Sequence, residues 1–166
     1  MKKKTLINLA SGLLTMSGIA MIATVAVHMM AEPKVPEKDL ECLALNIYHE
    51  ARGETVEGQI GVAHVTLNRV AHANWPGSVC GVVYQHKQFS WTWQIKDHTP
   101  YERKSYREAK AIARDVIIGN VIDPTKGSVF YHARWVNPSW TSYMEVSKVI
   151  GNHIFYTWDG DWQPNE

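Results

Sequence analysis

The sequence predicts an α+β domain that is preceded by one amino-terminal transmembrane helix. An apolar stretch of membrane-spanning length opens the chain, and three segments with apolar residues at three- and four-residue spacing follow it. Short segments rich in β-branched and aromatic residues close the chain. We expect residues 1–31 to form the membrane segment, residues 32–38 a linker, and residues 39–166 a single domain.

The composition excludes several classes of protein. The 166 residues carry a formal net charge of +1, and 45% of them are hydrophobic and 20% charged. These values exclude a disordered or collagen-like chain, and the near-neutral charge argues against a nucleic-acid-binding protein. Two cysteines are too few for a disulfide-dense mini-protein or a four-cysteine zinc site.

The amino-terminal segment lies between Lys4 and Glu32 and contains no charged residue. About 20 apolar residues cross a bilayer as a helix. Because three lysines precede the segment and acidic residues follow it, we expect a cytoplasmic amino terminus and a periplasmic domain. The long core and the absence of a clean Ala-x-Ala site favour a retained inner-membrane anchor over a cleaved signal peptide. Polar residues within the segment leave later release into the periplasm open as an alternative.

Three helices are predicted after a linker that contains two prolines. The first begins near Glu37, ends at Gly53, and has its apolar positions at Leu40, Leu43, Ala44, Ile47, Tyr48 and Ala51. The second follows Thr55 as its N-cap and presents Ile60, Ala63, Leu67 and Val70 on one face. The third covers about residues 101–118 and buries Tyr106, Ala109, Ile112, Ala113, Val116 and Ile117, before Gly119 ends it.

Three short strands are predicted in the last part of the chain. They cover residues 128–132, 145–150 and 153–157, and the last two are joined by a turn at Gly151 and Asn152. Helices followed by a small sheet make an α+β domain of about 125 residues, which is large enough for one hydrophobic core.

The densest polar cluster in the helical region covers residues 49–54 and has the sequence His-Glu-Ala-Arg-Gly-Glu. A carboxyl group at the end of a buried helix has its pKa raised by desolvation, which suits a general acid. Glu50 is therefore the candidate acid. Glu54 would share its face of the helix if the helix continued, but Gly53 leaves this open.

Other chemistries are less well supported by the sequence. His49 and Glu50 begin like a His-Glu-x-x-His zinc motif, but glycine occupies position 53, so we predict no metal site and no cofactor. Convergence of His49, His132 and His153 with Glu50 on zinc remains an alternative that their spacing does not require. A serine nucleophile would lack the Gly-x-Ser-x-Gly turn. Outside the cytoplasm, Cys42 and Cys80 are expected to form a disulfide rather than a nucleophilic site.

A series of short motifs resembles the SleB/CwlJ-like cell-wall hydrolase family. The first block covers residues 42–54, and further blocks follow in the family's order. They lie at residues 57–59, 63–65, 67–70, 79–83, 88–91, 123–125, 130–132, 138–140 and 151–156. The resemblance therefore extends from about residue 40 to residue 157.

The resemblance implies a compact, lysozyme-like catalytic domain that acts on the glycan strands of peptidoglycan. The family's catalytic acid is the first glutamate of Glu-Ala-Arg-Gly-Glu, which falls on Glu50. A lytic transglycosylase needs one such acid, because the 6-hydroxyl of muramic acid attacks in place of water, whereas a muramidase normally needs a second carboxylate. We expect a lytic transglycosylase that cleaves between N-acetylmuramic acid and N-acetylglucosamine during cell lysis or wall remodelling.

The alternatives are a muramidase, an N-acetylmuramoyl-L-alanine amidase, and, from another class, a non-catalytic wall-binding module. The expected partners are peptidoglycan and the inner membrane, and we expect a monomer that binds no nucleic acid. The disulfide would tie the first helix to the loop after the second helix.

Substrate-binding residues are predicted from the same blocks and from the chemistry of sugars, whose apolar faces stack on aromatic rings. The stacking candidates are Phe89, Trp91, Tyr131 and Trp140, with Trp93 and Trp135 as weaker ones. The candidates for polar contacts are Glu54, Asn68, Gln88, Ser90 and His132. Core packing is the alternative for each aromatic residue.

Overall fold

The computed structural model describes residues 34–158. The predicted membrane segment, residues 1–31, lies outside this range. Among the described residues, no helix combines the length and the apolar character needed to cross a bilayer. The predicted combination of helices with a small carboxyl-terminal sheet is confirmed.

The helical layer is built on α2 (Glu37–Ala51), which contacts α3 (Val56–Ala71), α4 (Val79–Val83) and α6 (Arg103–Ile117). Leu43, Ile47 and Tyr48 of α2 are fully buried and form the centre of the main core. Burial of this many aliphatic and aromatic side chains is the main favourable contribution to folding. The helix therefore holds its last turn, which contains Glu50, in a fixed position.

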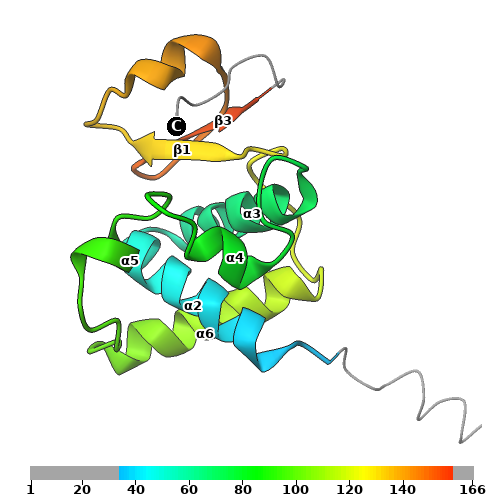
Figure 1. The fold of residues 1–166 in the computed structure, drawn as a ribbon, viewed down its shortest axis with the longest axis vertical. Helices are drawn as coiled ribbons and strands as arrows, with labels where there is room; N and C mark the ends of the chain where they lie inside the picture. The colour runs from blue at the N-terminus through cyan, green and yellow to red at the C-terminus, as the bar shows by residue number, and fades with distance from the viewer. Residues whose placement is uncertain (1–33, 159–166) are drawn as a thin grey trace, which may run out of the picture. The chain divides into compact units, whose positions relative to one another are not determined.

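The helix α3 lies between the helical layer and the sheet (Figure 1). Thr55 caps it as predicted, with its hydroxyl accepting a hydrogen bond from the Gly58 N–H at 3.2 Å. The predicted apolar face of α3 packs on the main core, but Val65 on another side contacts Ile150 and Phe155 of the sheet. The helix is thus buried on two sides, where the sequence pattern predicted one.

Gly61 is the point of closest approach between α3 and the sheet. A Cβ atom at this position would lie 2.8 Å from the Phe155 ring, closer than carbon atoms tolerate. Glycine therefore lets the helix approach the sheet closely enough to fix the position of its strands.

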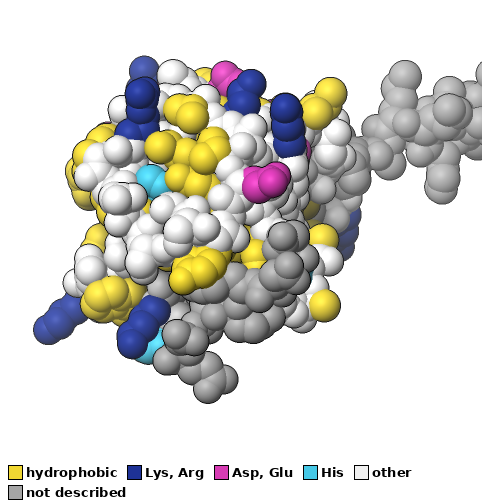
Figure 2. All heavy atoms as spheres, turned by 90° about the horizontal axis from the view of Figure 1, so that it is seen from above, with side chains coloured by type: hydrophobic (Ala, Val, Ile, Leu, Met, Phe, Trp, Pro, Cys, Tyr) yellow, Lys and Arg dark blue, Asp and Glu magenta, His cyan; other side chains and the backbone are white. Residues whose placement is uncertain are grey.

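The sheet contains β1 (Phe130–Ala133), β2 (Glu145–Ile150) and β3 (His153–Thr157) in the order β1-β3-β2, and both strand pairs are antiparallel. Tyr131 of β1 is opposite Phe155 of β3. Gly151, with φ of +54°, makes the turn between β2 and β3. Figure 2 views the molecule from the side of this sheet, where hydrophobic side chains reach the surface between lysines and arginines.

Some elements differ from the sequence-based expectation. The short helices α4 and α5 (Trp91–Gln94) and the 3₁₀ helix η1 (Ser139–Tyr143) were not predicted, because four or five residues show no readable helical period. The last two residues of the predicted linker already belong to α2. Cys42 and Cys80 form a disulfide with a Cα–Cα distance of 5.3 Å, which joins α2 to the helix α4 rather than to a loop.

Candidate active site

The candidate acid Glu50 lies in the last turn of α2, where the helix end faces β1. The Tyr131 hydroxyl of β1 donates a hydrogen bond of 2.9 Å to Glu50 Oε2, across 81 residues of sequence. Tyr131 is itself positioned by the rings of His153 and Phe155, whose centroids lie 5.0 and 5.7 Å from its own. The sheet thus supplies the group that orients the acid.

Arg69 is a second, buried neighbour of the acid, and it comes from α3. Its Nε donates a hydrogen bond of 2.7 Å to the Val129 carbonyl. Its guanidinium lies 5.4 to 5.8 Å from the centroids of the rings of Trp75, Phe89 and Phe130. These contacts hold a positive charge close to Glu50, although no ion pair joins the two residues in the described part of the chain.

The electrostatics of the site favour a protonated Glu50. Burial raises the pKa of Glu50, while the Tyr131 hydrogen bond and the Arg69 charge lower it and only partly offset burial. Burial lowers the pKa of Arg69 to about 10, so this side chain remains cationic at neutral pH. Burial also raises the pKa of Tyr131 well above its usual value, so its hydroxyl stays a hydrogen-bond donor. A carboxylic acid that retains its proton in such a site is suited to donate it.

Glu50 lies between two pockets and lines both of them. The β1-side pocket, of about 330 Å³, is lined by Glu50, Glu54, Arg69, Gln88, Phe89, Tyr131, His132, Ala133, Trp135 and His153. The α5-side pocket, of about 420 Å³, is lined by His49, Glu50, Arg52, Ser90, Trp91, Gln94, Ile95, Asp97, Thr99 and Tyr101. An acid that lines two pockets can act on a bond inside a polymer chain that extends into both pockets.

Glu54 lies in the β1-side pocket, but its carboxylate already has partners. Its two oxygens accept hydrogen bonds of 3.0 Å from the backbone N–H and the side-chain amide of Asn152. Burial would raise the pKa of Glu54, but these hydrogen bonds and the nearby His153 outweigh burial and lower it. The helix ends at Ala51, so Glu50 and Glu54 do not share a helical face. Glu54 fastens the β2–β3 turn to the segment between α2 and α3.

The structure brings most of the predicted substrate-binding residues to these two pockets. Gln88, Phe89, Tyr131 and His132 line the β1-side pocket, and Ser90 and Trp91 line the α5-side pocket. Asn68 lines neither pocket, because its side-chain amide donates to Asp123 Oδ2 at 3.0 Å and to the Ser128 carbonyl at 2.9 Å.

Trp140 also lines neither pocket. It packs on the rings of Phe130, His132 and Tyr156 at centroid distances of 5.3 to 5.6 Å. Asn68 and Trp140 thus serve the fold of this region rather than the pockets.

The aromatic residues nearest Glu50 are mostly buried. Phe89 and Trp91 are each only 3% exposed, which leaves almost no ring surface on which a sugar could stack. Trp91 Nε1 donates to Asn46 Oδ1 at 3.0 Å, and its ring stacks on His49 at 4.4 Å. These two rings form the floor of the pockets. Trp135, predicted as a weaker candidate, is 75% exposed at the β1-side pocket and offers a free ring.

Arg69 and His153 line the β1-side pocket, but neither was predicted as a substrate-binding or catalytic residue, and His153 was named only for the alternative zinc site. The sequence signal of Arg69 is weak, because it is a single cation among the apolar positions of the second helix. The histidines of the alternative zinc site lie in different pockets, with His49 in one and His132 and His153 in the other. No group of three metal-ligating side chains is found within residues 34–158.

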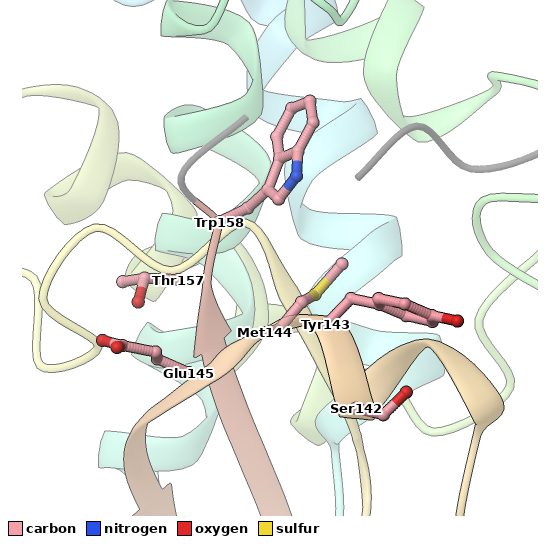
Figure 3. Close-up of a pocket in the computed structure, with 6 residues that line it drawn as sticks. All are labelled: Ser142, Tyr143, Met144, Glu145, Thr157 and Trp158. Carbon is pink, nitrogen blue, oxygen red and sulfur yellow. The ribbon is translucent and has the colours of Figure 1, made fainter. Parts of the chain in front are cut away.

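A third pocket, of about 530 Å³, is larger than both but contains none of the predicted site residues (Figure 3). It is lined by Ser142, Tyr143, Met144, Glu145, Thr157 and Trp158. Glu145 is its one carboxylate among these residues. The pockets beside Glu50 therefore remain the candidate active site, because they combine a half-buried acid with a hydrogen-bond donor and a cation.

Comparison with known proteins finds that the cell wall hydrolase family matches residues 53–156. The match begins directly after Arg52, so Glu50 lies just before it. The spore cortex-lytic enzyme of Bacillus cereus is 34% identical over 125 residues, which are 72% of this chain and 44% of that enzyme. The chain thus spans less than half the length of this curated relative.

Two solved structures are similar to the chain in both fold and sequence. The catalytic domain of the Bacillus cereus SleB protein has a TM-score of 0.62 and 33% identity, over 76% of this chain and 95% of that domain. The catalytic domain of the germination-specific lytic transglycosylase SleB from Bacillus anthracis has a TM-score of 0.63 and 31% identity. It is matched over its full length and covers 76% of this chain.

Proposed function

The chain belongs to the cell wall hydrolase family, and on this basis we propose that it is a lytic transglycosylase with Glu50 as its single acid and base. It would cleave peptidoglycan between N-acetylmuramic acid and N-acetylglucosamine. The similarity to a domain described as a lytic transglycosylase supports this reaction class. The half-buried Glu50, whose pKa burial raises, lines two pockets, and this arrangement supports the site.

The proposed reaction uses Glu50 twice. The protonated carboxyl donates its proton to the glycosidic oxygen as the bond to the muramic acid C1 breaks. The resulting carboxylate then accepts the proton of the muramic acid 6-hydroxyl, whose oxygen bonds to C1 and forms a 1,6-anhydro ring. No water is consumed, and the acid returns to its starting state.

The observation that carries the proposal is the contrast between Glu50 and the other carboxylates of its pockets. Glu54 is ionised and both its oxygens are hydrogen-bonded to Asn152, so it is poorly placed to activate water. Asp97, in the α5-side pocket, accepts hydrogen bonds from Thr99, which lower its pKa. A muramidase would need one of these two carboxylates as its base, and Asp97 is the stronger candidate for that role.

We place the reaction in the periplasm, with the inner membrane as a second partner. The support is the sequence of residues 1–31, with three lysines before an uncharged apolar stretch. Its polar residues favour an anchor that releases the domain during cell lysis, with wall remodelling as the other setting. Replacing those polar residues with leucine should delay lysis if release occurs, and unchanged lysis timing would exclude release.

Mass spectrometry of the products from purified sacculi tests the reaction. A lytic transglycosylase releases muropeptides with 1,6-anhydromuramic ends, and we expect these to dominate. Reducing muramic acid ends would identify a muramidase, and free peptides an amidase. Binding to sacculi with no released product would identify a non-catalytic wall-binding module.

A further inference from the structure

We propose that Arg69 is a positioning residue that pairs with the Glu50 carboxylate after the acid has given up its proton. The inference rests on the proposed function, because it concerns the second half of the same proton cycle. The Tyr131 hydroxyl orients the acid through its hydrogen bond to Oε2, and Arg69 would pair with the acid once it is ionised.

The first support is the rigidity of the Arg69 side chain. It is 5% exposed, its Nε is bonded to the Val129 carbonyl at 2.7 Å, and three aromatic rings surround its guanidinium. Burying a charge is costly unless the charge has a partner. A cation held this firmly near an acid must therefore have a use that offsets that cost.

The second support is an unused donor. Arg69 Nη1 is enclosed by protein atoms and has no hydrogen-bond partner among the described residues. Because the atom is enclosed, a sugar in the pocket cannot reach it directly, and its acceptor must come from the protein. Glu50 and Glu54 both line the same pocket, but both Glu54 oxygens are bonded to Asn152, whereas Glu50 Oε1 accepts no hydrogen bond from the described residues. A rotation of the Glu50 side chain would offer this oxygen to Arg69.

The third support comes from the other charged groups around Glu50, most of which have partners of their own. Arg52 is partly exposed and forms an ion pair with Glu102 at 3.2 Å. Glu54 is bonded to Asn152, and Asp97 to Thr99.

The histidines near the acid are occupied or enclosed in the same way. His49 is stacked on Trp91 and bonded to the His98 carbonyl, and His132 is bonded to the Tyr156 hydroxyl at 2.8 Å. Burial lowers the pKa of His153, so this side chain is neutral at neutral pH. Of the described groups that line the two pockets, Arg69 is thus the buried cation without an ion-pair partner.

The test follows Glu50 and Arg69 by NMR in the full chain in detergent micelles, so it does not depend on activity. In the wild type, we expect the Arg69 guanidinium resonances to shift at the pH at which the Glu50 carboxyl titrates. In Glu50→Gln, which keeps the shape of the side chain but cannot ionise, this shift should disappear. Guanidinium resonances whose chemical shifts do not change as Glu50 titrates would overturn the proposal, whether or not the protein cleaves peptidoglycan.

Kinetics give a second readout with a matched control. Arg69→Met removes the charge, so the pKa of Glu50 should rise and the alkaline limb of the pH–rate profile on sacculi should move to higher pH. Losing a charge-assisted hydrogen bond to the ionised acid should also lower the maximal rate about 10- to 100-fold. Arg69→Lys keeps the charge and should leave the limb close to that of the wild type.

A purely structural role for Arg69 would lower the rate of Arg69→Met without moving the limb, and that result would contradict the proposal. If Arg69→Met does not fold, the wild-type and Glu50→Gln titrations still decide between the outcomes.

Discussion

Two glutamates only four residues apart, Glu50 and Glu54, occupy opposite environments. Glu50 is covered by β1 and receives one hydrogen bond, from a tyrosine, so burial dominates and its pKa rises. Glu54 lies in the turn after the helix and receives two hydrogen bonds from Asn152, so its pKa falls. Glu50 therefore gives up its proton less readily than an ordinary glutamate, whereas Glu54 is ionised and holds a turn in place.

The hydrogen-bond partners of the two glutamates, and not their spacing in sequence, determine their different roles. The two carboxyls belong to one motif, but Tyr131 and Asn152 are 81 and 98 residues away from them in sequence. Both partners are carried by the sheet, which α3 positions through Val65 and Gly61. The same helix–sheet contact therefore supports the partners that shift the pKa values of the two glutamates in opposite directions.

The largest expected effect separates the two glutamates by activity. Glu50→Gln should reduce muropeptide release from sacculi by about 10²- to 10⁴-fold, the usual contribution of a general acid. Glu54→Gln is the matched control and should retain most of the activity. Thermal unfolding would verify that both variants fold. Equal losses in the two variants would remove the distinction between them.

Removing the disulfide tests whether the link at Cys42, in the first half of α2, is needed to position Glu50 in the last turn of the same helix. Cys42→Ala/Cys80→Ala should lower the free energy of unfolding by about 3–4 kcal/mol, as expected for a loop of 38 residues. Denaturant unfolding measures this change. In the folded variant, the Tyr131–Glu50 contact should persist, so the activity per folded molecule should be close to that of the wild type. A loss of activity larger than the unfolded fraction would show that the disulfide also positions Glu50.

Substitution of Gly61 tests the contact between α3 and the sheet, which carries the hydrogen-bond partners of both glutamates. A valine at this position would collide with the Phe155 ring and push α3 from the sheet, at a cost of about 1–3 kcal/mol. Because Tyr131 and Asn152 would move together, Gly61→Val should weaken catalysis and stability at once. Gly61→Ala, which adds one methyl group, should have a smaller effect in the same direction. A fully active and stable Gly61→Val would contradict the assigned role of this contact.

The smallest expected effect is a pair of opposite changes in stability. Hydrogen bonds from Asn152 lower the pKa of Glu54 in the folded state, so they stabilise the fold where Glu54 is ionised. This stabilisation is complete at pH values above the ordinary glutamate pKa of about 4.3, and it is lost as the pH falls through the lower pKa of the folded state. The raised pKa of Glu50 costs stability as the pH rises from its unfolded to its folded value. Thermal unfolding at pH 7 should therefore show Glu54→Gln destabilised by about 1 kcal/mol, an exposed-site hydrogen-bond effect.

Glu50→Gln should be at least as stable as the wild type in the same measurement, because an amide carries no charge to desolvate. A Glu50→Gln variant that is clearly less stable at pH 7 would contradict a Glu50 whose ionised form is destabilised by burial.

The sequence predicted the elements whose signals are local. The period of α2 and α6, the Thr55 cap and the bounds of β2 and β3 all agree with the structure. The short helices were missed because they are held by tertiary contacts, such as the bond from Trp91 to Asn46, rather than by their own pattern.

The site was predicted in part, for the same physical reason. The motif identified Glu50 and most of the residues around it. The presence of an aromatic residue in the sequence, however, does not show whether its ring is buried or exposed in the fold. Phe89 and Trp91 became the floor of the pockets and Trp135 their exposed edge. The role of Arg69 depends on its distance from Glu50 in space, which no spacing along the helix records.

The central claim, that one acid is sufficient, is tested most directly with a variant that removes the ionised carboxylates from both pockets. Sacculi would be digested with Glu54→Gln/Asp97→Asn, and the products identified by mass spectrometry. We expect muropeptides with 1,6-anhydromuramic ends, in amounts close to those of the wild type after correction for the folded fraction. Loss of all products from the folded double variant, while wild-type products carry reducing ends, would contradict this claim and identify a second catalytic carboxylate.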